Sequence, residues 1–200
     1  MRAYADAGRA GARGMRGTGG GREALNARAA EATPGIADTD SLYDMPGHLI
    51  RRCHQISVAL FHQECAHFGV TPQQYAVLRV LATHDGIDQI TLAGLAAFNR
   101  TTAGELVARL EAGGLLTRAD GSDDRRVKNL FITKGGRQLV KNLHAGVLRV
   151  QERLLEPLDK AERKRFIACL ARIADVNNEL SRAPLRAPRA RRRGVATGGE

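Results

Sequence analysis

The chain has 200 residues and a net charge of +10 at neutral pH, with 31 Lys and Arg against 21 Asp and Glu. This length is typical of one domain of ordinary size, and the basic excess makes polyanions plausible partners. No apolar stretch is long enough for a membrane span or a secretory signal, so we expect a cytoplasmic protein without membrane contact.

Both ends of the chain differ in composition from its middle. The first forty residues are rich in Ala, Gly and Arg, and residues 181–200 contain six arginines, two prolines and a single acid. Such segments cannot bury enough apolar surface to offset the conformational entropy that ordering costs. We therefore predict a disordered tail over 1–41, an ordered region over 42–182, and a basic disordered tail over 183–200.

The ordered region begins with two helix patterns. The segment 46–69 starts with a proline, ends with a glycine and carries apolar residues at helical spacing. The segment 71–86 offers Thr71 as N-cap and Pro72 as the first helical residue, and it also ends at a glycine.

Two shorter helices and a hairpin follow. "TLAGLAAF" (91–98) is predicted to be a short helix capped by Thr91, and the next helix starts from Asn99 and stops at Gly113-Gly114. The runs "LLTRAD" and "VKNLFIT" flank a polar loop and predict a hairpin over 115–133.

Two longer helices complete the ordered region. Thr133 is the predicted N-cap of the first, and Pro157 interrupts the chain before the second, which is predicted over 159–181. Apolar residues recur at helical spacing in both. These residues are Leu139, Leu143, Val147, Val150 and Leu154 in the first helix and Phe166, Leu170, Ile173 and Val176 in the second.

This order of elements predicts a mainly α protein with a small β-hairpin wing, a winged helix-turn-helix. In such a domain one short helix supports the next one. That second helix enters the major groove by its N-terminal residues, and the hairpin lies against flanking DNA. The hairpin loop carries Asp123, Asp124, Arg125 and Arg126, and arginines there suit phosphates or a minor groove. We predict that Asp124 pairs with Arg126, so that Arg125 is presented outward.

Over residues 45–180 the sequence resembles the MarR family of bacterial transcription regulators. "TPQQYAVLRVL", "TLAGLA", "LVARLEAGGLLTR" and "DDRRVKNLFIT" occur in the family's order. The resemblance implies a homodimer in which helices from 42–69 and 134–182 interlock, while two winged domains (71–133) read a palindromic operator. Half-sites about 34–36 Å apart are expected for such pairs. One departure is the turn "AAFNRTT", which is tighter than in many members, so the positions of the base contacts carry over only to within about one residue.

The resemblance also assigns DNA contacts position by position. Residues at the start of the recognition helix should lie nearest the DNA, and hydroxyls there suit phosphates or thymine. Glu105 either accepts from cytosine N4 or pairs with Arg109 at i+4, and Arg109 is either a phosphate clamp or a solvated residue. The predicted DNA-binding residues are Arg100, Thr101, Thr102, Glu105, Arg109, Arg118, Arg125, Arg126 and Lys128.

A small aromatic acid or its thioester is the effector that the resemblance implies, bound where the dimerisation helices meet the winged domain. A carboxylate there needs a cation, which Arg51 or Arg52 can supply, and Tyr75 can form an aromatic wall. The two adjacent arginines also suit a solvated face or a salt bridge across the dimer. The opening "LYDMPGHLIRRCHQI" resembles regulators of aromatic-acid catabolism, including repressors of nicotinate degradation that respond to 6-hydroxynicotinate. The predicted effector-binding residues are His48, Arg51, Arg52, His54 and Tyr75.

Other chemistry has weaker support in the sequence. Cys53 and Cys169 fall among apolar neighbours, which favours buried reduced thiols, although Cys53 or Cys65 is also a candidate redox sensor. His62, Cys65 and His67 lie close in sequence, but a closed zinc site needs four ligands on one face. No Gly-rich phosphate loop follows a strand, so nucleotide binding has no support in the sequence. The paired carboxylates Asp123 and Asp124 lie in a loop and not in a fixed pocket, which disfavours general acid–base catalysis. We expect no enzyme activity, metal or cofactor.

Two functions from different classes therefore remain. The first is a repressor released by its ligand, and the second is an architectural protein that binds DNA without sequence preference through its winged domain and basic tail. Non-specific binding is mostly counterion release, so the salt and sequence dependence of binding separates them. A protein-interaction scaffold that has lost DNA binding is disfavoured by the arginines at the hairpin tip.

Overall fold

The computed structural model describes residues 41–120 and 128–186. The predictions for residues 1–40 and 187–200 and for the hairpin loop therefore lie outside the described residues, and these include the roles of Arg125 and Arg126. Residues 183–186 of the predicted C-terminal tail are described, and Leu185 and Arg186 there donate hydrogen bonds to the side chains of Asn178 and Glu179. The described residues fall into two compact units that divide between Leu49 and Ile50. In the short first unit, the Ser41 hydroxyl accepts a hydrogen bond from the Tyr43 N–H and caps a 3-10 turn.

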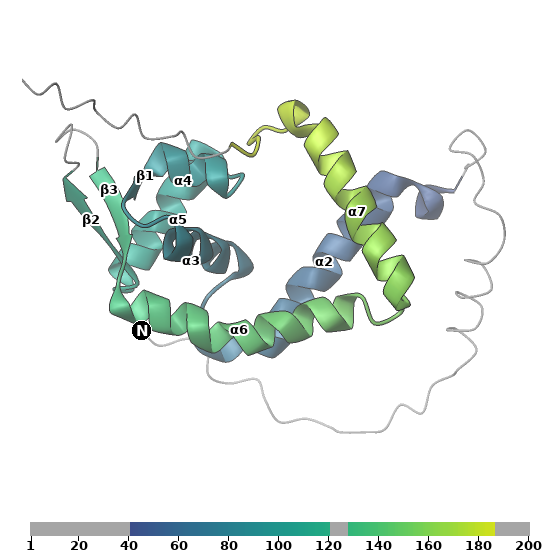
Figure 1. Ribbon diagram of the computed structural model, residues 1–200, viewed down its shortest axis with the longest axis horizontal. Helices are drawn as coiled ribbons and strands as arrows, with labels where there is room; N and C mark the ends of the chain where they lie inside the picture. Colours follow the sequence, from purple (N-terminus) through teal and green to yellow (C-terminus); the bar gives the residue numbers. More distant parts are fainter. Residues whose placement is uncertain (1–40, 121–127, 187–200) are drawn as a thin grey trace, which may run out of the picture. The chain divides into compact units, whose positions relative to one another are not determined.

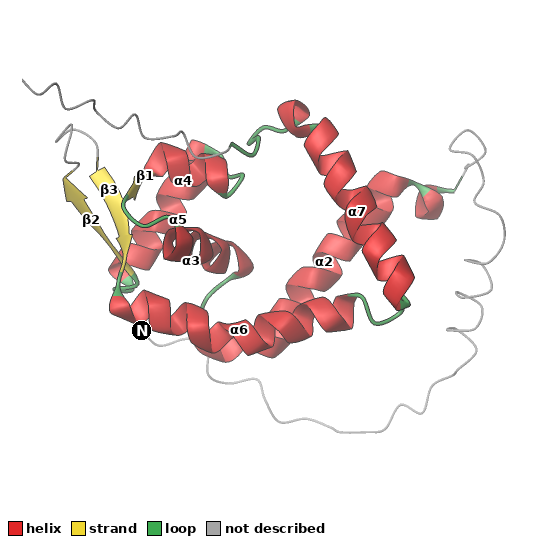
Figure 2. Ribbon diagram, viewed as in Figure 1, coloured by secondary structure: helices red, strands yellow, loops and turns green. Residues whose placement is uncertain are grey.

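The second unit is mainly helical and carries one small sheet, which confirms the predicted fold class (Figures 1 and 2). Helix α2 begins in the first unit and continues into the second. In chain order the elements are η2 (Leu42–Asp44), α2 (Pro46–Cys65), η3 (Ala66–Phe68), α3 (Pro72–Thr83), β1 (Ile87–Asp88), α4 (Gln89–Leu95), α5 (Arg100–Ala112), β2 (Leu116–Asp120), β3 (Lys128–Ile132), α6 (Lys134–Leu154), α7 (Lys160–Val176) and η4 (Asn178–Leu180).

The sheet has three antiparallel strands in the order β1-β3-β2. Strands β2 and β3 form the predicted hairpin, with Arg118 opposite Leu130. The sequence did not predict β1, whose Ile87 pairs with Leu130 from the other side. The wing is therefore held to the segment that leads into α4.

Three predicted N-caps are confirmed by their hydrogen bonds. Thr71 and Gln74 form a reciprocal capping box at the start of α3. The Asn99 side chain accepts from the third residue of α5 at 2.8 Å, and the Thr133 hydroxyl accepts from the third residue of α6 at 3.0 Å. These caps satisfy backbone donors that a helix N-terminus leaves unpaired, and so they fix where each helix begins.

The predicted cap of α4 is wrong. Asp88 caps this helix and accepts from the N–H groups of Ile90 and Thr91, at 2.8 and 3.0 Å. Thr91 lies one turn inside and donates its hydroxyl to Asp88 at 2.6 Å. Partial burial acts to raise the pKa of Asp88, but these hydrogen bonds outweigh it and hold the pKa below its ordinary value. A carboxylate also complements the positive end of the helix dipole, which a threonine cannot do.

Several helices end earlier than predicted. Helix α2 stops at Cys65, and a 3-10 turn continues to Gly69, whose φ of 69° ends the segment. Helix α4 ends at Leu95 and α7 at Val176. In α2 and α7 the sequence pattern continues into a 3-10 turn at the C-terminal end of the helix. Residue types alone do not distinguish such a turn from α-helix.

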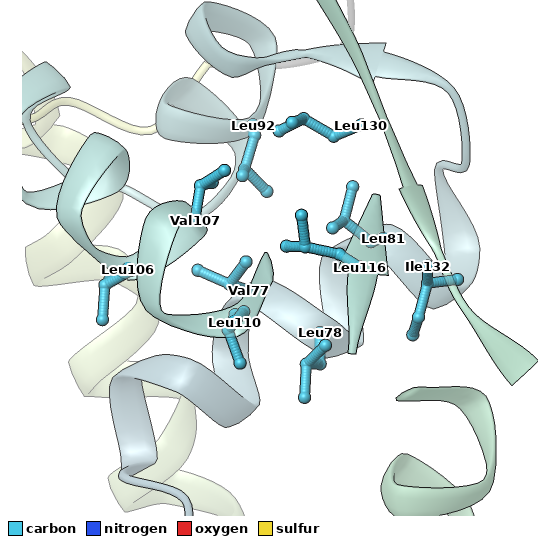
Figure 3. Close-up of a cluster of buried hydrophobic side chains, with 10 residues drawn as sticks. All are labelled: Val77, Leu78, Leu81, Leu92, Leu106, Val107, Leu110, Leu116, Leu130 and Ile132. Atoms are coloured by element: carbon cyan, nitrogen blue, oxygen red, sulfur yellow. The ribbon is translucent and has the colours of Figure 1, made fainter. Parts of the chain in front are cut away.

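The winged domain has its own core, made by ten buried apolar side chains from three helices and two strands (Figure 3). Burial of this surface is the main force that holds α5 and the wing in fixed positions. The ten residues are Val77, Leu78, Leu81, Leu92, Leu106, Val107, Leu110, Leu116, Leu130 and Ile132.

A second buried cluster joins α2 to α6, with Phe61, Cys65, Leu143 and Val150 among its members. Leu143 and Val150 belong to the predicted apolar seam of α6, which is confirmed. Beside the cluster, Glu64 accepts hydrogen bonds from two arginines of α6, at 2.7 and 2.8 Å. The two long helices are thus joined by apolar packing and by the ion pairs of Glu64 with Arg149 and Arg153.

Glu64→Gln should remove part of the pH dependence of stability. Hydrogen bonds from Arg149 and then Arg153 hold the pKa of Glu64 below its ordinary value. This stabilisation is therefore present above the unfolded-state pKa of about 4.3 and is lost as the pH falls through the lower folded-state value. We expect the wild type to melt above the variant near neutral pH and the two melting temperatures to converge in acid. A gap that is independent of pH would contradict this assignment.

Apolar side chains remain exposed on α2 and α7. Phe166, Leu170, Ile173 and Val176, which form the predicted seam of α7, are 36, 38, 52 and 78% exposed. On α2, Ile56 is 48% exposed. These faces have the character expected of an interface that a single chain leaves uncovered. Within the described residues, no helix is both long and apolar enough to cross a membrane.

Candidate nucleic-acid interface

The N-terminal half of α5 presents polar side chains on the side opposite its buried face. Arg100, Thr101 and Glu105 are exposed, whereas Thr102 is half-buried and its N–H is bonded to the cap. The buried face packs into the core of the winged domain. The first turn of α5 is therefore held rigidly, with a cation and a hydroxyl directed away from the protein, as contact with DNA requires.

The turn between α4 and α5 is tight, as its sequence predicted. Ala97 adopts a left-handed φ of 52°, its N–H donates to the Gly94 carbonyl at 3.3 Å, and the Phe98 N–H donates to the Ala93 carbonyl at 2.9 Å. The backbone of this turn thus satisfies carbonyls at the end of α4 and sets where α5 begins.

Ala97→Gly should stabilise the protein, because a left-handed residue with a Cβ is strained and glycine is not. We expect the free energy of unfolding to rise by about 0.5 kcal/mol, since relief of strain exceeds the added entropy of the unfolded chain. Urea unfolding followed by circular dichroism measures this. A loss of 1 kcal/mol or more, on the order of a helix-interior glycine, would show that Ala97 contributes packing that outweighs its strain.

The two described cations of the wing are already paired with acids. Arg118 lies 3.1 Å from Glu111 of α5, and Lys128 forms an ion pair with Asp120, which faces it in the hairpin register. All four side chains are at least one-third exposed. The first pair connects the wing to the recognition helix, and the second closes the described part of the hairpin.

Glu105 and Arg109 are both exposed on α5. Among the described residues, no ion pair joins them, so the structure does not contain the intrahelical pair that was the alternative to DNA contact. The contacts predicted for these residues with bases and phosphates stay predictions.

Asp85 ties the base of the wing to α6. Its carboxylate accepts from the Ile132 N–H at 2.9 Å and from Arg137 of α6 at 2.5 Å, and Arg137 also donates to the Ala82 carbonyl at 3.4 Å. Sequence reasoning missed this tether, because its partners are about fifty residues apart. In the sequence, Asp85 and Arg137 are two separate charged residues, and no local pattern indicates that they pair.

The predicted effector residues lie in different surroundings. Tyr75 of α3 is half-buried, packs on the second core cluster, and its ring centroid is 6.2 Å from that of Phe61. On α2, Arg51 donates to Gln55 at 3.1 Å, whereas Arg52 and His54 are exposed. Tyr75 is therefore at the junction of α2, α3 and α6, where the predicted aromatic wall would be.

His48 belongs to the short first unit. Its ring meets Tyr43 edge-on, with 5.7 Å between the centroids. The role of His48 in effector binding stays a prediction, and so do the roles of the other four residues.

The prediction of buried thiols at Cys53 and Cys169 is wrong for the single chain, because both are exposed and Cys65 is buried instead. Burial raises the pKa of the Cys65 thiol, which disfavours a reactive thiolate there. The His67 ring lies 4.0 Å from the Phe68 ring. Among the residues described, no three His, Cys, Asp or Glu side chains are placed to hold a metal ion.

The MarR family model matches residues 68–126, a range that begins at the end of η3 and contains α3, α4, α5 and β2. The transcriptional regulator FarR of Neisseria gonorrhoeae is 30% identical over 113 residues, which cover 55% of this chain and 77% of FarR. The chain belongs to the MarR family. The resemblance of its motifs is thus confirmed, and the MarR assignment makes it a relative of transcriptional regulators.

Solved structures of two other regulators resemble this MarR-family chain. BpsR of Bordetella bronchiseptica, solved to explain how 6-hydroxynicotinic acid regulates its DNA binding, has a TM-score of 0.66 at 26% identity; the match covers 68% of this chain and 98% of BpsR. The repressor CouR bound to a 23-mer DNA duplex has a TM-score of 0.64 at 28% identity, over 68% of this chain and 96% of CouR. CouR of Rhodococcus jostii RHA1 was also solved with p-coumaroyl-CoA, with a TM-score of 0.60 at 25% identity over the same shares.

Proposed function

We propose that this MarR-family chain is a homodimeric, sequence-specific DNA-binding regulator that represses transcription from a palindromic operator and is released by a small aromatic acid or its thioester. The observation that carries the proposal is the exposed first turn of α5, with Arg100 and Thr101 held beside a wing that carries Arg118. A scaffold of this kind is present in the CouR repressor that was solved on a duplex.

DNA contact requires little rearrangement of the described side chains. Arg100 and Thr101 open α5 and would contact base edges and phosphates in the major groove. Arg118 and Lys128 would exchange their acid partners for phosphates. Exposed ion pairs such as theirs are worth only about 0–1 kcal/mol, so the exchange costs little.

The dimer would form through the exposed apolar faces of α2 and α7. Side chains such as Ile56 and Ile173, which are about half exposed in one chain, would be covered by a second copy. The two α5 helices would then enter successive major grooves about 34–36 Å apart. A palindrome follows from the two-fold symmetry of such a dimer.

The effector site would lie where α2, α3 and α6 meet. The Tyr75 and Phe61 rings provide an aromatic surface, and Arg51 or Arg52 would provide the cation for a carboxylate. The ligands of BpsR and CouR, 6-hydroxynicotinic acid and p-coumaroyl-CoA, support this class of compound. A coupling of about 1–3 kcal/mol, or 5- to 150-fold in DNA affinity, is the usual range for such an effect.

A gel-shift titration on promoter fragments near the gene tests this function, with 6-hydroxynicotinate, p-coumaroyl-CoA and benzoate as the added compounds. We expect the chain to bind one palindromic fragment roughly 10³-fold more tightly than random DNA, and one compound to release it. Light scattering should show a dimer. Equal affinity for all fragments would instead establish the architectural, sequence-independent alternative.

Arg51→Ala combined with Arg52→Ala should raise the effector concentration needed for release by about tenfold, which corresponds to roughly 1.4 kcal/mol. DNA affinity without effector should not change, because both residues lie on α2 outside the winged domain. Arg79→Ala, at an exposed position of α3, is the matched control. An unchanged release curve for the double variant would exclude these arginines from the effector site.

A further inference from the structure

A glutamine in the first turn of α4 lies against the recognition helix. Helices α4 and α5 pack together through buried side chains such as Leu92 and Val107 (Figure 3). Beside this core, a Cβ at Gly104 of α5 would lie 3.2 Å from the side-chain nitrogen of Gln89 and 3.9 Å from its amide carbon. The Gln89 amide therefore lies on the surface of α5, at a position that has no side chain of its own.

Gly104 borders the exposed face of α5 that the proposed function directs to DNA. Residues three or four apart are neighbours on a helix surface. The neighbours of Gly104 include Arg100 and Thr101, one turn before it, and Ala108, one turn after it, and all three are exposed. The Gln89 amide is therefore placed beside the first turn of the recognition helix, although it belongs to α4.

The amide of Gln89 is a half-buried polar group for which the described residues provide no hydrogen-bond partner. It has two N–H donors and a carbonyl acceptor. The backbone donors of this turn are already used, because Asp88 accepts from the N–H groups of Ile90 and Thr91. The side chain of Gln89, and not the helix backbone, is thus a donor that α4 offers next to α5.

We propose that Gln89 is a further DNA-contacting residue, whose side-chain N–H donates to a phosphate oxygen of the strand next to the groove that α5 enters. This inference rests on the proposed function, since its partner is the DNA that α5 binds. In a helix-turn-helix the second helix lies in the major groove while the first crosses the backbone, so phosphates are the acceptors expected in front of α4. Amide side chains are among the groups that contact phosphates. Gly104 leaves the space that the amide occupies beside α5.

Gln89→Glu tests the donor, because glutamate has the same shape but cannot donate a hydrogen bond when it is ionised. Affinity is measured by fluorescence anisotropy on the operator and on a random duplex over a salt series, and melting curves check the fold. We expect a loss of about tenfold or more on both duplexes at low salt, because the carboxylate repels the phosphate. The loss should shrink as salt screens this repulsion.

Gln89→Lys should have the opposite effect. A lysine there places a cation within reach of the same phosphate, so we expect tighter binding at low salt and a slope of log K against log salt that is steeper by about 0.9 per chain. Gln73→Glu and Gln73→Lys are the matched controls. They make the same charge changes at an exposed residue in the first turn of α3, where Val70 and Tyr75 pack in the second core cluster. Both controls should leave the affinity and the slope nearly unchanged.

Gly104→Ala tests the place of the amide. The atom that the new methyl group would meet is the free end of a flexible side chain, and alanine has the higher helix propensity, so the variant should melt no lower than the wild type. We expect DNA affinity to fall by about threefold when Gln89 is present, because the displaced amide keeps only part of its hydrogen bond. In a Gln89→Ala background the same substitution should cause no loss.

The outcomes separate the two proposals. If Gln89→Glu keeps the wild-type affinity, or Gln89→Lys the wild-type salt slope, Gln89 does not contact a phosphate and the inference is wrong. A change of preference at one base pair would show a base contact, which also overturns the phosphate assignment. Equal losses from Gly104→Ala with and without Gln89 would show that the amide does not lie over Gly104 when DNA is bound. If the wild type prefers no promoter fragment over random DNA, the proposed function fails instead.

Discussion

Gly136→Ala should be among the most destabilising single substitutions in the winged domain, lowering the free energy of unfolding by about 3 kcal/mol or more. Its Cβ would lie 2.2 Å from the Leu115 carbonyl oxygen and 2.8 Å from a side-chain carbon of Ile132. Neither neighbour is the free end of a flexible side chain. We expect chemical denaturation to show the loss and DNA binding to fall with it at physiological temperature.

The carbonyl that alanine would meet cannot easily move. The same Leu115 oxygen accepts from the Thr133 N–H at 3.1 Å, and the Thr133 hydroxyl donates to the Gly114 carbonyl at 2.9 Å. The first turn of α6 is therefore bonded to the junction between α5 and β2. A substitution that pushes α6 away would break the contacts that hold the wing against the recognition helix.

Gly135→Ala is the matched control for this prediction. This neighbouring residue is also in the first turn of α6, but a Cβ there would meet only the Thr133 hydroxyl, at 3.7 Å. Alanine has the higher helix propensity, so we expect no loss and a gain of up to about 1 kcal/mol. Equal destabilisation by the two alanines would show that the close approach at Gly136 is not the cause.

Much of this fold could be predicted because its helix boundaries are encoded by local chemistry. Thr71, Asn99 and Thr133 each accept from a backbone N–H three residues ahead, so the residue type and its place before an apolar stripe suffice. The cap of α4 was missed because the sequence offers two candidates three residues apart. The carboxylate of Asp88 binds two N–H groups as well as the Thr91 hydroxyl, and it therefore displaces the threonine.

The remaining features depend on residues that are distant in sequence. Strand β1 has only two residues and exists because β3 offers an edge to pair with. The Asp85–Arg137 tether and the hydrogen bond from the Arg186 N–H to the Gly94 carbonyl join segments about 50 and 90 residues apart, which no local pattern reports. Exposure of Cys53 and Cys169 has a related cause, since an apolar stripe shows which face is buried but not whether the covering partner is the same chain.

These long-range contacts converge on the element that would read DNA. Arg137 of α6 binds Asp85 at the base of the wing, and Glu111 of α5 binds Arg118 of the wing. The Arg186 N–H donates to the Gly94 carbonyl and so links the residues after η4 to α4. A ligand that alters the packing of α2 against α6 would therefore move the winged domain as a unit. In the proposed dimer, a shift of this kind would change the spacing of the two recognition helices without changing either one, and the match to a palindrome would be lost.

Arg100→Ala is expected to have the largest effect on operator recognition among the described residues of α5. The residue is the first of the helix, is exposed, and follows a cap that fixes its position. Loss of an arginine that contacts a base edge costs about 1–3 kcal/mol, or roughly 5- to 150-fold in affinity, and it relaxes preference at one position of the site. Anisotropy titrations on the operator and on single-base variants of it measure both effects.

Arg109→Ala provides the contrast on the same helix. Arg109 is also exposed but lies in the last turn of α5, where a cation would contact a phosphate rather than a base. Its loss should weaken binding to all sequences alike and reduce the salt slope by about 1, leaving the ratio of operator to random affinity unchanged. If Arg109→Ala altered the sequence preference and Arg100→Ala did not, α5 would enter the groove by its opposite end, and the assignment of its first turn as the reading element would be wrong.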